Sequence, residues 1–523
     1  MDVYSFGLMV ACLLVIFYFH TKIILSALCI FMVVITCRTY LLHFYRNLCG
    51  SPRGPLPLPI LGNIHQLGVM AHENLRLLSK TYGRVMRVLV GDDVVYVISG
   101  ANEILEGLVT KSVDFAGRPF TYTLNLTTGG KGIAFADYDP KWRFYRKIAH
   151  SSMRMFGNGL KTIENLVTEE SQALHTRFDK HVGEPIDPHH DLGLAVLNVV
   201  FAMIFGSRYD IEDNEFQDLI TSNTMFVRGF EYDSYIDVFP SLRFLPNKRI
   251  STLKHAIDMR RPILQKHFQK HKDSFDPSGD NKRDLAYALL DALHEAETND
   301  KQAVQEFLQY DFLLSVLDDM IGAGSETTTT TLRWAVVYLV NFPECQQKCI
   351  EQIEEVVGMD RLPTIKDKPS LPYIEAFLHE TLRMSSIAPM AVPHKTTCDT
   401  SIGGYKLPKD SKVIFNLYAL HRDEKEWPEP LKFDPTRFLD DNGQLLPPGH
   451  NRAFLPFSAG RRICLAESLA KLELFLVIAQ MIAKFQFLQA PGHPLPSLVG
   501  QPGLFLGPKP HKIVIDKRVA TGA

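Results

Sequence analysis

The cysteine of one short segment has surroundings that suit a reactive thiolate. The segment FLPFSAGRRICLAE, residues 454–467, places Arg461 and Arg462 just before Cys464, and a long apolar stretch follows. Cationic groups and the N-terminus of a helix both stabilise a thiolate, and Gly460 permits a tight turn ahead of it. On these residues alone, a buried structural cysteine, a nucleophile and a metal ligand all remain open.

Two further segments combine polar groups at helical spacing. In HETLR, Glu380 and Arg383 lie three residues apart and share one helix face, where a surface ion pair is the simplest interpretation. In KWRFYRK, Trp142 and Arg146 lie one turn apart, and an indole N–H and a guanidinium both suit an anionic carboxylate. Taken alone, this second pattern is also typical of an ordinary amphipathic helix.

A third segment contains residues that a purely structural helix would avoid. Residues 321–334, IGAGSETTTTTLRW, carry two glycines and five consecutive threonines within a long apolar helix predicted from about 301 to 341. These residue types cost helix propensity, which indicates a functional use. A dinucleotide-binding fingerprint is excluded because the third glycine is missing and no strand precedes the segment. A helix kink with a solvated glutamate remains the structural alternative.

Taken in their order along the chain, these segments resemble the cytochrome P450 family. Phe457, Gly460, Arg462 and Cys464 match F-x-x-G-x-R-x-C, the haem-thiolate loop of that family, although Ala466 stands where members often have glycine. The other segments resemble the W-x-x-x-R, A/G-G-x-D/E-T-T and E-x-x-R motifs. The resemblance covers nearly the whole chain and implies the cytochrome P450 fold, which is mainly α with small β-sheets.

The resemblance implies a cofactor and the residues that hold it. The cofactor would be haem b, iron protoporphyrin IX, with the thiolate of Cys464 as the ligand of the iron. The small residues Ala323 and Gly324 would let the backbone of the long helix approach the haem. The haem propionates would be faced by Trp142, Arg146, His394 and Arg462, while Phe457 and Gly460 would complete the cysteine loop.

The same resemblance implies catalytic and structural roles. Thr327 would act in oxygen activation and Glu326 would relay protons, as hydroxyl and carboxyl groups do in general acid catalysis. Glu380 and Arg383, with Arg437 of FDPTRF, would brace the region that carries the cysteine loop, since the planar arginine fork bridges a carboxylate in a bidentate manner. An apolar substrate pocket would be lined by Ala323, Ile387, Val392, Leu504 and Phe505.

The implied reaction inserts one atom of O2 into a C–H bond of an apolar substrate and reduces the other atom to water. Electrons would come from NADPH through NADPH–cytochrome P450 reductase, since no flavin or nicotinamide motif is visible, with cytochrome b5 as a further candidate partner. The runs 385–408, 416–430 and 495–510 resemble steroid-hydroxylating animal microsomal members, which predicts a steroid substrate. Three alternatives remain: a xenobiotic or fatty-acid mono-oxygenase, a haem-thiolate isomerase or dehydratase that needs no reductase, and a membrane-tethered haem sensor.

The composition is that of a large globular protein. The chain of 523 residues is 46% hydrophobic and 22% charged, so it can bury a large core. Its net charge of −2, from 56 basic and 58 acidic residues, gives no indication of nucleic-acid binding. The eight cysteines fit neither a disulfide framework nor a CxxC zinc site, which favours a reducing compartment for the body.

The N-terminus predicts a membrane anchor within residues 1–50. Residues 3–19 and 23–37 carry no charge, and a crossing of the lipid bilayer needs about 20 apolar residues. A retained anchor is favoured over a cleaved signal peptide because no basic stretch precedes the apolar run. The arginines that follow predict a cytoplasmic body, and the resemblance to microsomal members implies the endoplasmic reticulum membrane. A single crossing and a hairpin both remain open.

The anchor is followed by a proline-rich segment and then by one large body. Four prolines in residues 51–59 predict a stiff, extended hinge between membrane and globule. Residues 60–523 would form a single haem domain. Within it, residues 84–100 alternate β-branched runs with turn residues, which is typical of a small sheet, and most of the remainder has a helical pattern.

Overall fold

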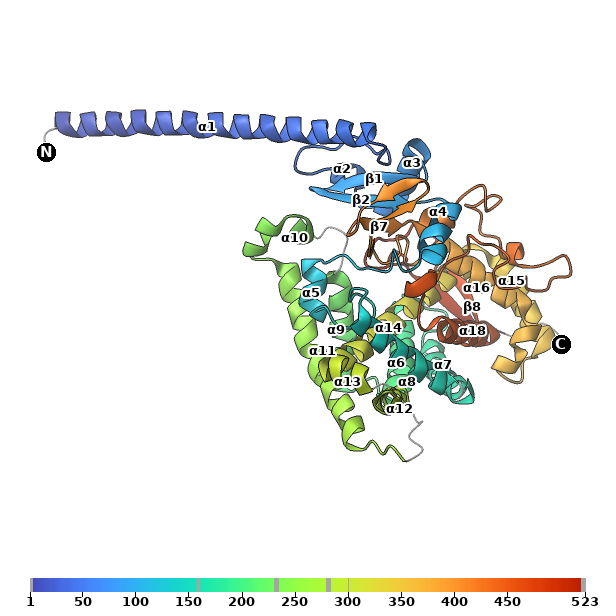
Figure 1. Cartoon of the computed structure of the whole chain (residues 1–523). Coiled ribbons are helices and arrows are strands. Elements are labelled where there is room, and N and C mark those ends of the chain that lie inside the picture. The colour runs from blue at the N-terminus through green and yellow to red at the C-terminus, as the bar shows by residue number, and fades with distance from the viewer. Residues whose placement is uncertain (1–2, 158–159, 230–234, 279–283, 300, 519–523) are drawn as a thin grey trace.

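Helices dominate the computed structural model, which describes residues 3–157, 160–229, 235–278, 284–299 and 301–518 (Figure 1). The predicted class, mainly α with small β-sheets, is confirmed. The helices that build the body are α3 (Ala71–Tyr82), α6 (Pro140–Gly157), α7 (Leu160–Asp179), α8 (His189–Phe205), α9 (Asn214–Gly229), α11 (Lys248–Asp273), α12 (Leu285–Asn299), α14 (Tyr310–Asn341), α15 (Pro343–Val356), α16 (Pro372–Ser385) and α18 (Glu467–Lys484).

Shorter helical pieces connect these elements. The α-helical ones are α2 (Ile64–Leu67), α4 (Ala101–Leu105), α5 (Tyr122–Thr128), α10 (Tyr235–Val238), α13 (Lys301–Phe307) and α17 (Leu417–Leu420). The tighter or wider turns are η1 (Glu106–Thr110), η2 (Pro240–Phe244), η3 (Ile365–Ser370), η4 (Pro435–Phe438) and η5 (Gly460–Arg462).

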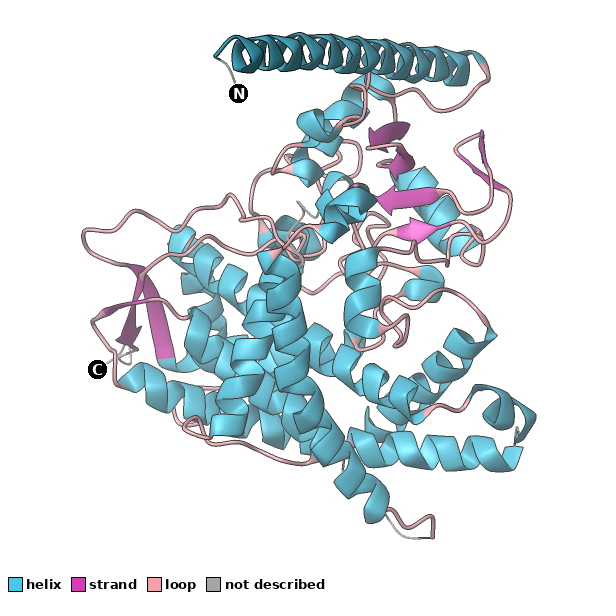
Figure 2. Ribbon diagram, turned by 90° about the vertical axis from the view of Figure 1, so that its left-hand side faces the viewer, coloured by secondary structure: helices cyan, strands magenta, loops and turns pink. Residues whose placement is uncertain are grey.

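Within the described residues, three small sheets lie at the edges of the helical mass (Figure 2). The four-stranded sheet has the order β1-β2-β7-β4 and lies on the side of the N-terminal helix, whereas the sheet β3-β9-β8 lies near the C-terminus. The predicted strands within 84–100 are β1 and β2, paired antiparallel. The strands are β1 (Val85–Val90), β2 (Asp93–Ile98), β3 (Pro185–Ile186), β4 (His394–Lys395), β5 (Thr400–Ile402), β6 (Tyr405–Leu407), β7 (Lys412–Phe415), β8 (Phe485–Gln489) and β9 (Ile513–Lys517).

The helix α14 passes through the core because it is apolar on nearly every side. Every residue from Thr328 to Val340 is buried, and the helix packs against α8, α16 and α18. The single helix predicted from 301 to 341 is in fact two helices, α13 and α14. The hydroxyl of Tyr145 donates to Phe307 O and accepts the N–H of Gln309 at 2.6 Å, so it engages the main chain at the break.

The N-terminal segment forms one uninterrupted helix, α1 (Val3–Leu48), which projects from the body (Figure 1). Its portion His20–Leu48 is long and apolar enough to cross a membrane. The two apolar runs are therefore joined without the turn that a hairpin requires, which favours the single crossing.

The proline-rich segment packs onto the body instead of standing free as a spacer. The buried guanidinium of Arg87, on β1, donates to the carbonyl groups of Pro52 and His43 and, at 3.0 Å, to the side chain of Asn47. Gly54 lies so close to β1 that a Cβ there would stand 1.9 Å from the carbonyl oxygen of Arg87. The packed body therefore begins near Pro52, earlier than the predicted residue 60.

Candidate functional site

The middle of α14 carries an accessible stripe on an otherwise buried helix. Ala323 is exposed and Thr327 is half-buried, and their spacing of four residues puts them on one face. The hydroxyl of Thr327 donates to Ala323 O at 2.7 Å. Ser325 and Thr329 make the same bond to the carbonyl four residues earlier, a pattern that bends helices. The segment thus presents an accessible face where the helix would otherwise be sealed.

Gly324 and Glu326 lie off this stripe. A Cβ on Gly324 would meet Val200 of α8 at 3.4 Å, so this glycine lies against α8, and its approach to haem stays a prediction. The carboxylate of Glu326 accepts from the amide of Asn223, on α9, at 3.3 Å, and Arg260 of α11 reaches the same amide at 3.5 Å. Burial raises the pKa of Glu326. Adjacent residues of a helix diverge by about 100°, so Glu326 and Thr327 act from different faces.

The cysteine loop is closed by backbone hydrogen bonds. The N–H of Cys464 donates to Phe457 O at 3.0 Å, and the N–H of Ala466 is directed to the sulfur. The side chain of Cys464 is exposed, yet it lies deep enough that burial raises the pKa of the thiol, an effect that the Ala466 N–H and Arg146 oppose. The thiol therefore lies within the protein and still presents an accessible sulfur to a ligand.

The cation beside the cysteine is not the one that the sequence predicted. Arg461 is exposed, and Arg462 turns its guanidinium to the carbonyl groups of Ala116 at 2.8 Å and Ala136 at 2.9 Å. The positive charge that lowers the pKa of Cys464 belongs to Arg146, which donates to Ile463 O. The choice of Arg461 and Arg462 as thiolate-stabilising groups is therefore wrong.

Gly460 is required by the packing of the loop. Its φ of +73° lies in the left-handed region, and a Cβ there would stand 1.6 Å from the carbonyl oxygen of Leu108 in η1. Any side chain would push the cysteine loop away from η1.

Three buried or half-buried guanidinium groups form a cluster with few anionic partners: Arg118, Arg146 and Arg462. Among the described residues, these guanidinium groups donate to backbone carbonyl groups; Arg118 donates to Ala134 O, Val392 O and Pro393 O at 3.0 to 3.1 Å. Burial and mutual repulsion lower the pKa of Arg118 and Arg462, to about 9 for Arg462. Asp137 offsets part of this repulsion, but its carboxylate pairs with Lys395 at 2.6 Å.

Arg118 was missed by the sequence interpretation. It stands alone in the run FAGRPF, without a motif or a helical partner, so only its position as a charge between apolar residues could have drawn attention to it. The cluster that it completes is a ready-made site for carboxylates, since buried positive charge requires compensation.

Two other predicted propionate residues have partners within the protein. The indole N–H of Trp142 donates to Ile133 O at 3.0 Å, and its ring lies 3.9 Å from the guanidinium carbon of Arg462. Trp142 thus positions the arginine by stacking, and its N–H is not free for an anion. His394 bonds through Nδ1 to Phe115 O at 2.6 Å, and burial with the nearby charge of Arg118 holds its pKa well below the usual value.

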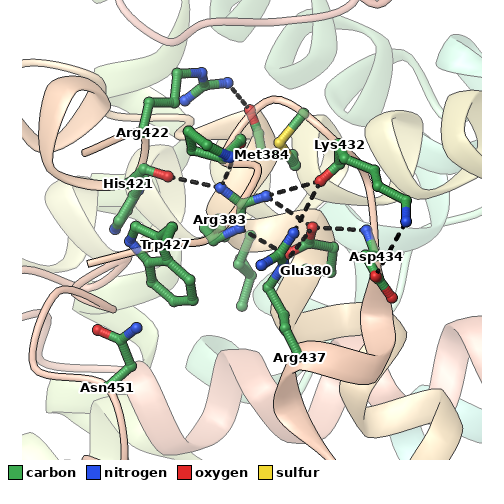
Figure 3. Close-up of polar contacts among 12 residues, drawn as sticks. Glu380, Arg383, Met384, His421, Arg422, Trp427, Lys432, Asp434, Arg437 and Asn451 are labelled. Atoms are coloured by element: carbon green, nitrogen blue, oxygen red, sulfur yellow. Dashed lines mark hydrogen bonds and ion pairs between the residues drawn. The ribbon is translucent and has the colours of Figure 1, made fainter. Parts of the chain in front are cut away.

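The predicted E-x-x-R brace is present and fully buried (Figure 3). Arg383 donates in a bidentate manner to Glu380, with Nε at 2.6 Å and the second nitrogen at 2.7 Å, and Arg437 reaches the same carboxylate at 3.1 Å. Arg383 also donates to His421 O at 2.7 Å. The ring of His421 accepts the N–H of Leu455 at 3.2 Å, which links the brace to the segment that leads into the cysteine loop.

The predicted pocket residues all retain accessible surface, as the lining of a pocket would. Ala323 is exposed, and the others are half-buried. The segment 385–392 meets the C-terminal loop where the N–H of Leu506 donates to Ile387 O at 2.8 Å. Leu506 O in turn accepts from the indole of Trp334 on α14 at 2.9 Å. These bonds hold the segments of Ile387, Val392, Leu504 and Phe505 next to α14.

Comparison with known proteins decides what this arrangement is. The profile of the family described as Cytochrome P450 matches residues 52–515. The chain belongs to the cytochrome P450 family. This P450 is similar to steroid 17-alpha-hydroxylase/17,20 lyase of Rana dybowskii (38% identity over 89% of this chain and 90% of the relative) and of Gallus gallus (40% over 87% and 90%).

Other relatives widen the comparison. Cytochrome P450 1A1 of Platichthys flesus is 35% identical over 84% of this P450 and 86% of its own length. Among solved structures, a zebra fish cytochrome P450 with progesterone has a TM-score of 0.75 and 34% identity, and the match covers 85% of this P450 and 99% of that chain. As a P450, the protein is a haem-thiolate mono-oxygenase that takes electrons from NADPH through a reductase and acts on a small molecule.

The residues present fit the haem that the family uses. Cys464 offers an accessible sulfur, and the cluster of Arg118, Arg146 and Arg462 offers positive charge for the two carboxylates of the porphyrin. When bound, thiolate-ligated haem iron activates O2 for insertion into a C–H bond. The chain contributes the ligand, the arginine cluster and the open stripe of α14, where the Thr327 hydroxyl can hold or pass a proton.

Arg118→Gln is expected to weaken haem retention by roughly 10- to 100-fold, since a hydrogen bond to a charged group contributes about 1.5–3 kcal/mol. The change removes a buried positive charge but keeps a donor for the carbonyl of Ala134. The rate of haem transfer to an excess of an acceptor protein measures the effect. Arg461→Gln, at an exposed position on the cysteine loop, should leave that rate unchanged, and equal rates for both variants would contradict the anion-binding role.

Proposed function

We propose that this P450 hydroxylates a steroid, in the manner of a 17-alpha-hydroxylase. The observation that supports this most is that relatives named steroid 17-alpha-hydroxylase/17,20 lyase from an amphibian, a bird and fishes are 37–40% identical over most of both chains. The similar solved structure with progesterone supports the same substrate class. The accessible stripe of Ala323, together with the half-buried Ile387, Leu504 and Phe505, suits a rigid apolar molecule.

We assign oxygen activation to Thr327 and proton supply to Glu326. Thr327 lies on the open face of α14, one turn beyond Ala323. Burial raises the pKa of Glu326, which favours its protonated form relative to an exposed glutamate, and the carboxyl group is held by Asn223. Since the two residues leave the helix on different faces, proton transfer between them requires intervening water or substrate.

We assign the electron supply to NADPH–cytochrome P450 reductase, with cytochrome b5 as a second partner. We place the protein in the endoplasmic reticulum membrane with the haem domain in the cytoplasm. The single helix α1 supports the membrane attachment. Arg87 binds the end of this helix and the proline-rich segment together, so the body is held at a defined orientation to its anchor.

The substrate is tested by titrating the haem-loaded protein with a panel of C19 and C21 steroids, fatty acids and planar aromatic hydrocarbons. A steroid is expected to shift the Soret absorption with a dissociation constant of about 1 μM or below, which corresponds to roughly −8 kcal/mol. Turnover with NADPH and reductase under isotopically labelled O2 should then add one labelled oxygen atom to that steroid. Tighter binding and turnover of an aromatic hydrocarbon would instead favour a function like that of the P450 1A1 relatives.

The same assay separates the remaining alternatives. An isomerase or dehydratase would convert its substrate without NADPH or reductase. A haem sensor would show spectral shifts and no product. Product formation that depends strictly on reductase is expected.

A further inference from the structure

A half-buried aspartate, Asp319, joins α14 to the loop that precedes α6. Its Oδ2 accepts the backbone N–H groups of Ile133 at 2.6 Å and of Ala134 at 2.9 Å. Asp319 precedes Ala323 and Thr327 at intervals of four residues, so all three belong to one face of the helix. The loop is thus attached to the same stripe of α14 that faces the site.

The loop fixed by Asp319 supplies acceptors to the arginine cluster. Ile133 O accepts from Trp142 and, at 3.3 Å, from Arg462, while Ala134 O accepts from Arg118 at 3.1 Å. A displacement of this short stretch would therefore move the cluster. Asp319 is thus linked to the arginine cluster through this loop.

The backbone of the loop is adapted to this contact. Gly132 has a φ of +90°, and a Cβ there would stand 2.3 Å from Oδ2 of Asp319. A side chain at this position is excluded by the carboxylate itself. The close approach thus requires glycine in the loop as well as aspartate on the helix.

Burial, together with the groups around it, places the pKa of Asp319 near neutrality. Burial raises the pKa of Asp319 to about 7; Asp318 on the same helix also raises it, while the two loop N–H groups and Arg260 of α11 lower it. Arg260 is itself paired with Asp318 at 2.6 Å. The neighbouring loop charge, Lys131, pairs with Asp311 at 3.3 Å.

We propose that Asp319 is a positioning residue that latches loop 132–137 onto α14 and holds it more tightly when its carboxyl is ionised. Ionisation releases the proton to solvent and turns both N–H bonds into charge-assisted bonds, which are about twice as strong as neutral ones. The arginine cluster is then held more firmly at pH 8 than at pH 6.

As the pH rises, ionisation of Asp319 strengthens its contact with the loop but lowers the overall stability of the fold. Because burial raises the pKa of Asp319 in the folded state above the ordinary value of 3.8, the stability that this group contributes is lost as the pH rises through about 7. Slower hydrogen exchange of the loop amides at high pH cannot therefore result from a gain in overall stability caused by Asp319.

The test is hydrogen–deuterium exchange of a peptide covering Ile133 and Ala134 in the haem-loaded protein, corrected for the intrinsic pH dependence of exchange. Wild type is expected to exchange these amides about tenfold more slowly at pH 8 than at pH 6. Asp319→Asn keeps both acceptor bonds but cannot ionise, so its corrected rates should be equal at both pH values and close to the wild-type rate at pH 6. The rate of haem transfer should follow the same pattern.

Two further variants make the outcome decisive. Asp318→Asn removes the neighbouring charge. This variant should keep the decrease in exchange rate with rising pH, and the midpoint of that decrease should move to lower pH. Gly132→Ala should raise exchange at both pH values, because its Cβ displaces the loop from the carboxylate. The proposal would be overturned if the exchange rate of wild type did not change between pH 6 and pH 8, or if the change persisted in Asp319→Asn.

Discussion

Cys464→Ala is expected to abolish both the thiolate signature in the carbon monoxide difference spectrum and all substrate oxidation. The side chain of Cys464 is exposed, and no other described cysteine lies in the cysteine loop. The loop itself should survive, since it is closed by the backbone N–H of residue 464 on Phe457 O, which alanine retains. The loss is therefore one of chemistry and not of fold.

The measurement is the difference spectrum together with far-ultraviolet circular dichroism of the same sample. Unchanged helicity with the thiolate signature gone is the expected combination. Cys398→Ala, at another exposed cysteine, is the matched control and should keep the wild-type spectrum. A Cys464→Ala protein that retains thiolate-type absorption would show that the iron ligand lies elsewhere in the chain.

The parts of the site that sequence could predict are those whose partners are close in sequence. Cys464 and Phe457 are seven residues apart, and Glu380 and Arg383 share a helical turn. Local spacing determines their geometry, so the motif carries most of the information. The prediction of Arg437 also required the family resemblance, because this residue contacts Glu380 from 57 residues away.

The parts that sequence could not predict depend on distant chain segments. Arg118 is recognisable only from its acceptors, and Val392 O is 274 residues away. Arg462 lies beside Cys464 in the sequence but turns to Ala116 and Ala136, so adjacency suggested the wrong cation. The break between α13 and α14 likewise depends on Tyr145, from another helix.

The packing of the proline-rich segment also depends on a distant part of the chain and could not be predicted from its sequence. Proline content correctly predicts a segment outside helices and stiff in φ. Whether such a segment stands free or packs depends on its neighbour, here Arg87 on β1, whose guanidinium needs the carbonyl groups that the segment and α1 provide. An arginine within the apolar run VMRVLV is a sequence feature that could have indicated a docking partner.

Arg383→Lys is expected to destabilise the folded protein by about 3–5 kcal/mol, because it leaves several buried carbonyl groups without a donor and each costs about 1–3 kcal/mol. Arg383 is fully buried and uses its planar fork for two bonds to Glu380 and further bonds to the carbonyl groups of His421, Pro430 and Lys432. Lysine has three donors on one nitrogen and cannot span these acceptors, so buried carbonyl groups lose their partners. Such a loss is a large share of a typical stability of about 5–15 kcal/mol.

Arg361→Lys is the matched control for this prediction. Arg361 makes the same bidentate contact with Asp367, at 2.6 and 2.7 Å, but its side chain is half exposed. An exposed ion pair contributes little to stability, so this variant should unfold almost as wild type does in urea. Because His421 links the brace to Leu455, Arg383→Lys should also lower the fraction of protein with thiolate-ligated haem before it unfolds. If both variants unfolded at the same urea concentration, burial of the Glu380–Arg383 pair would not be what secures the cysteine loop.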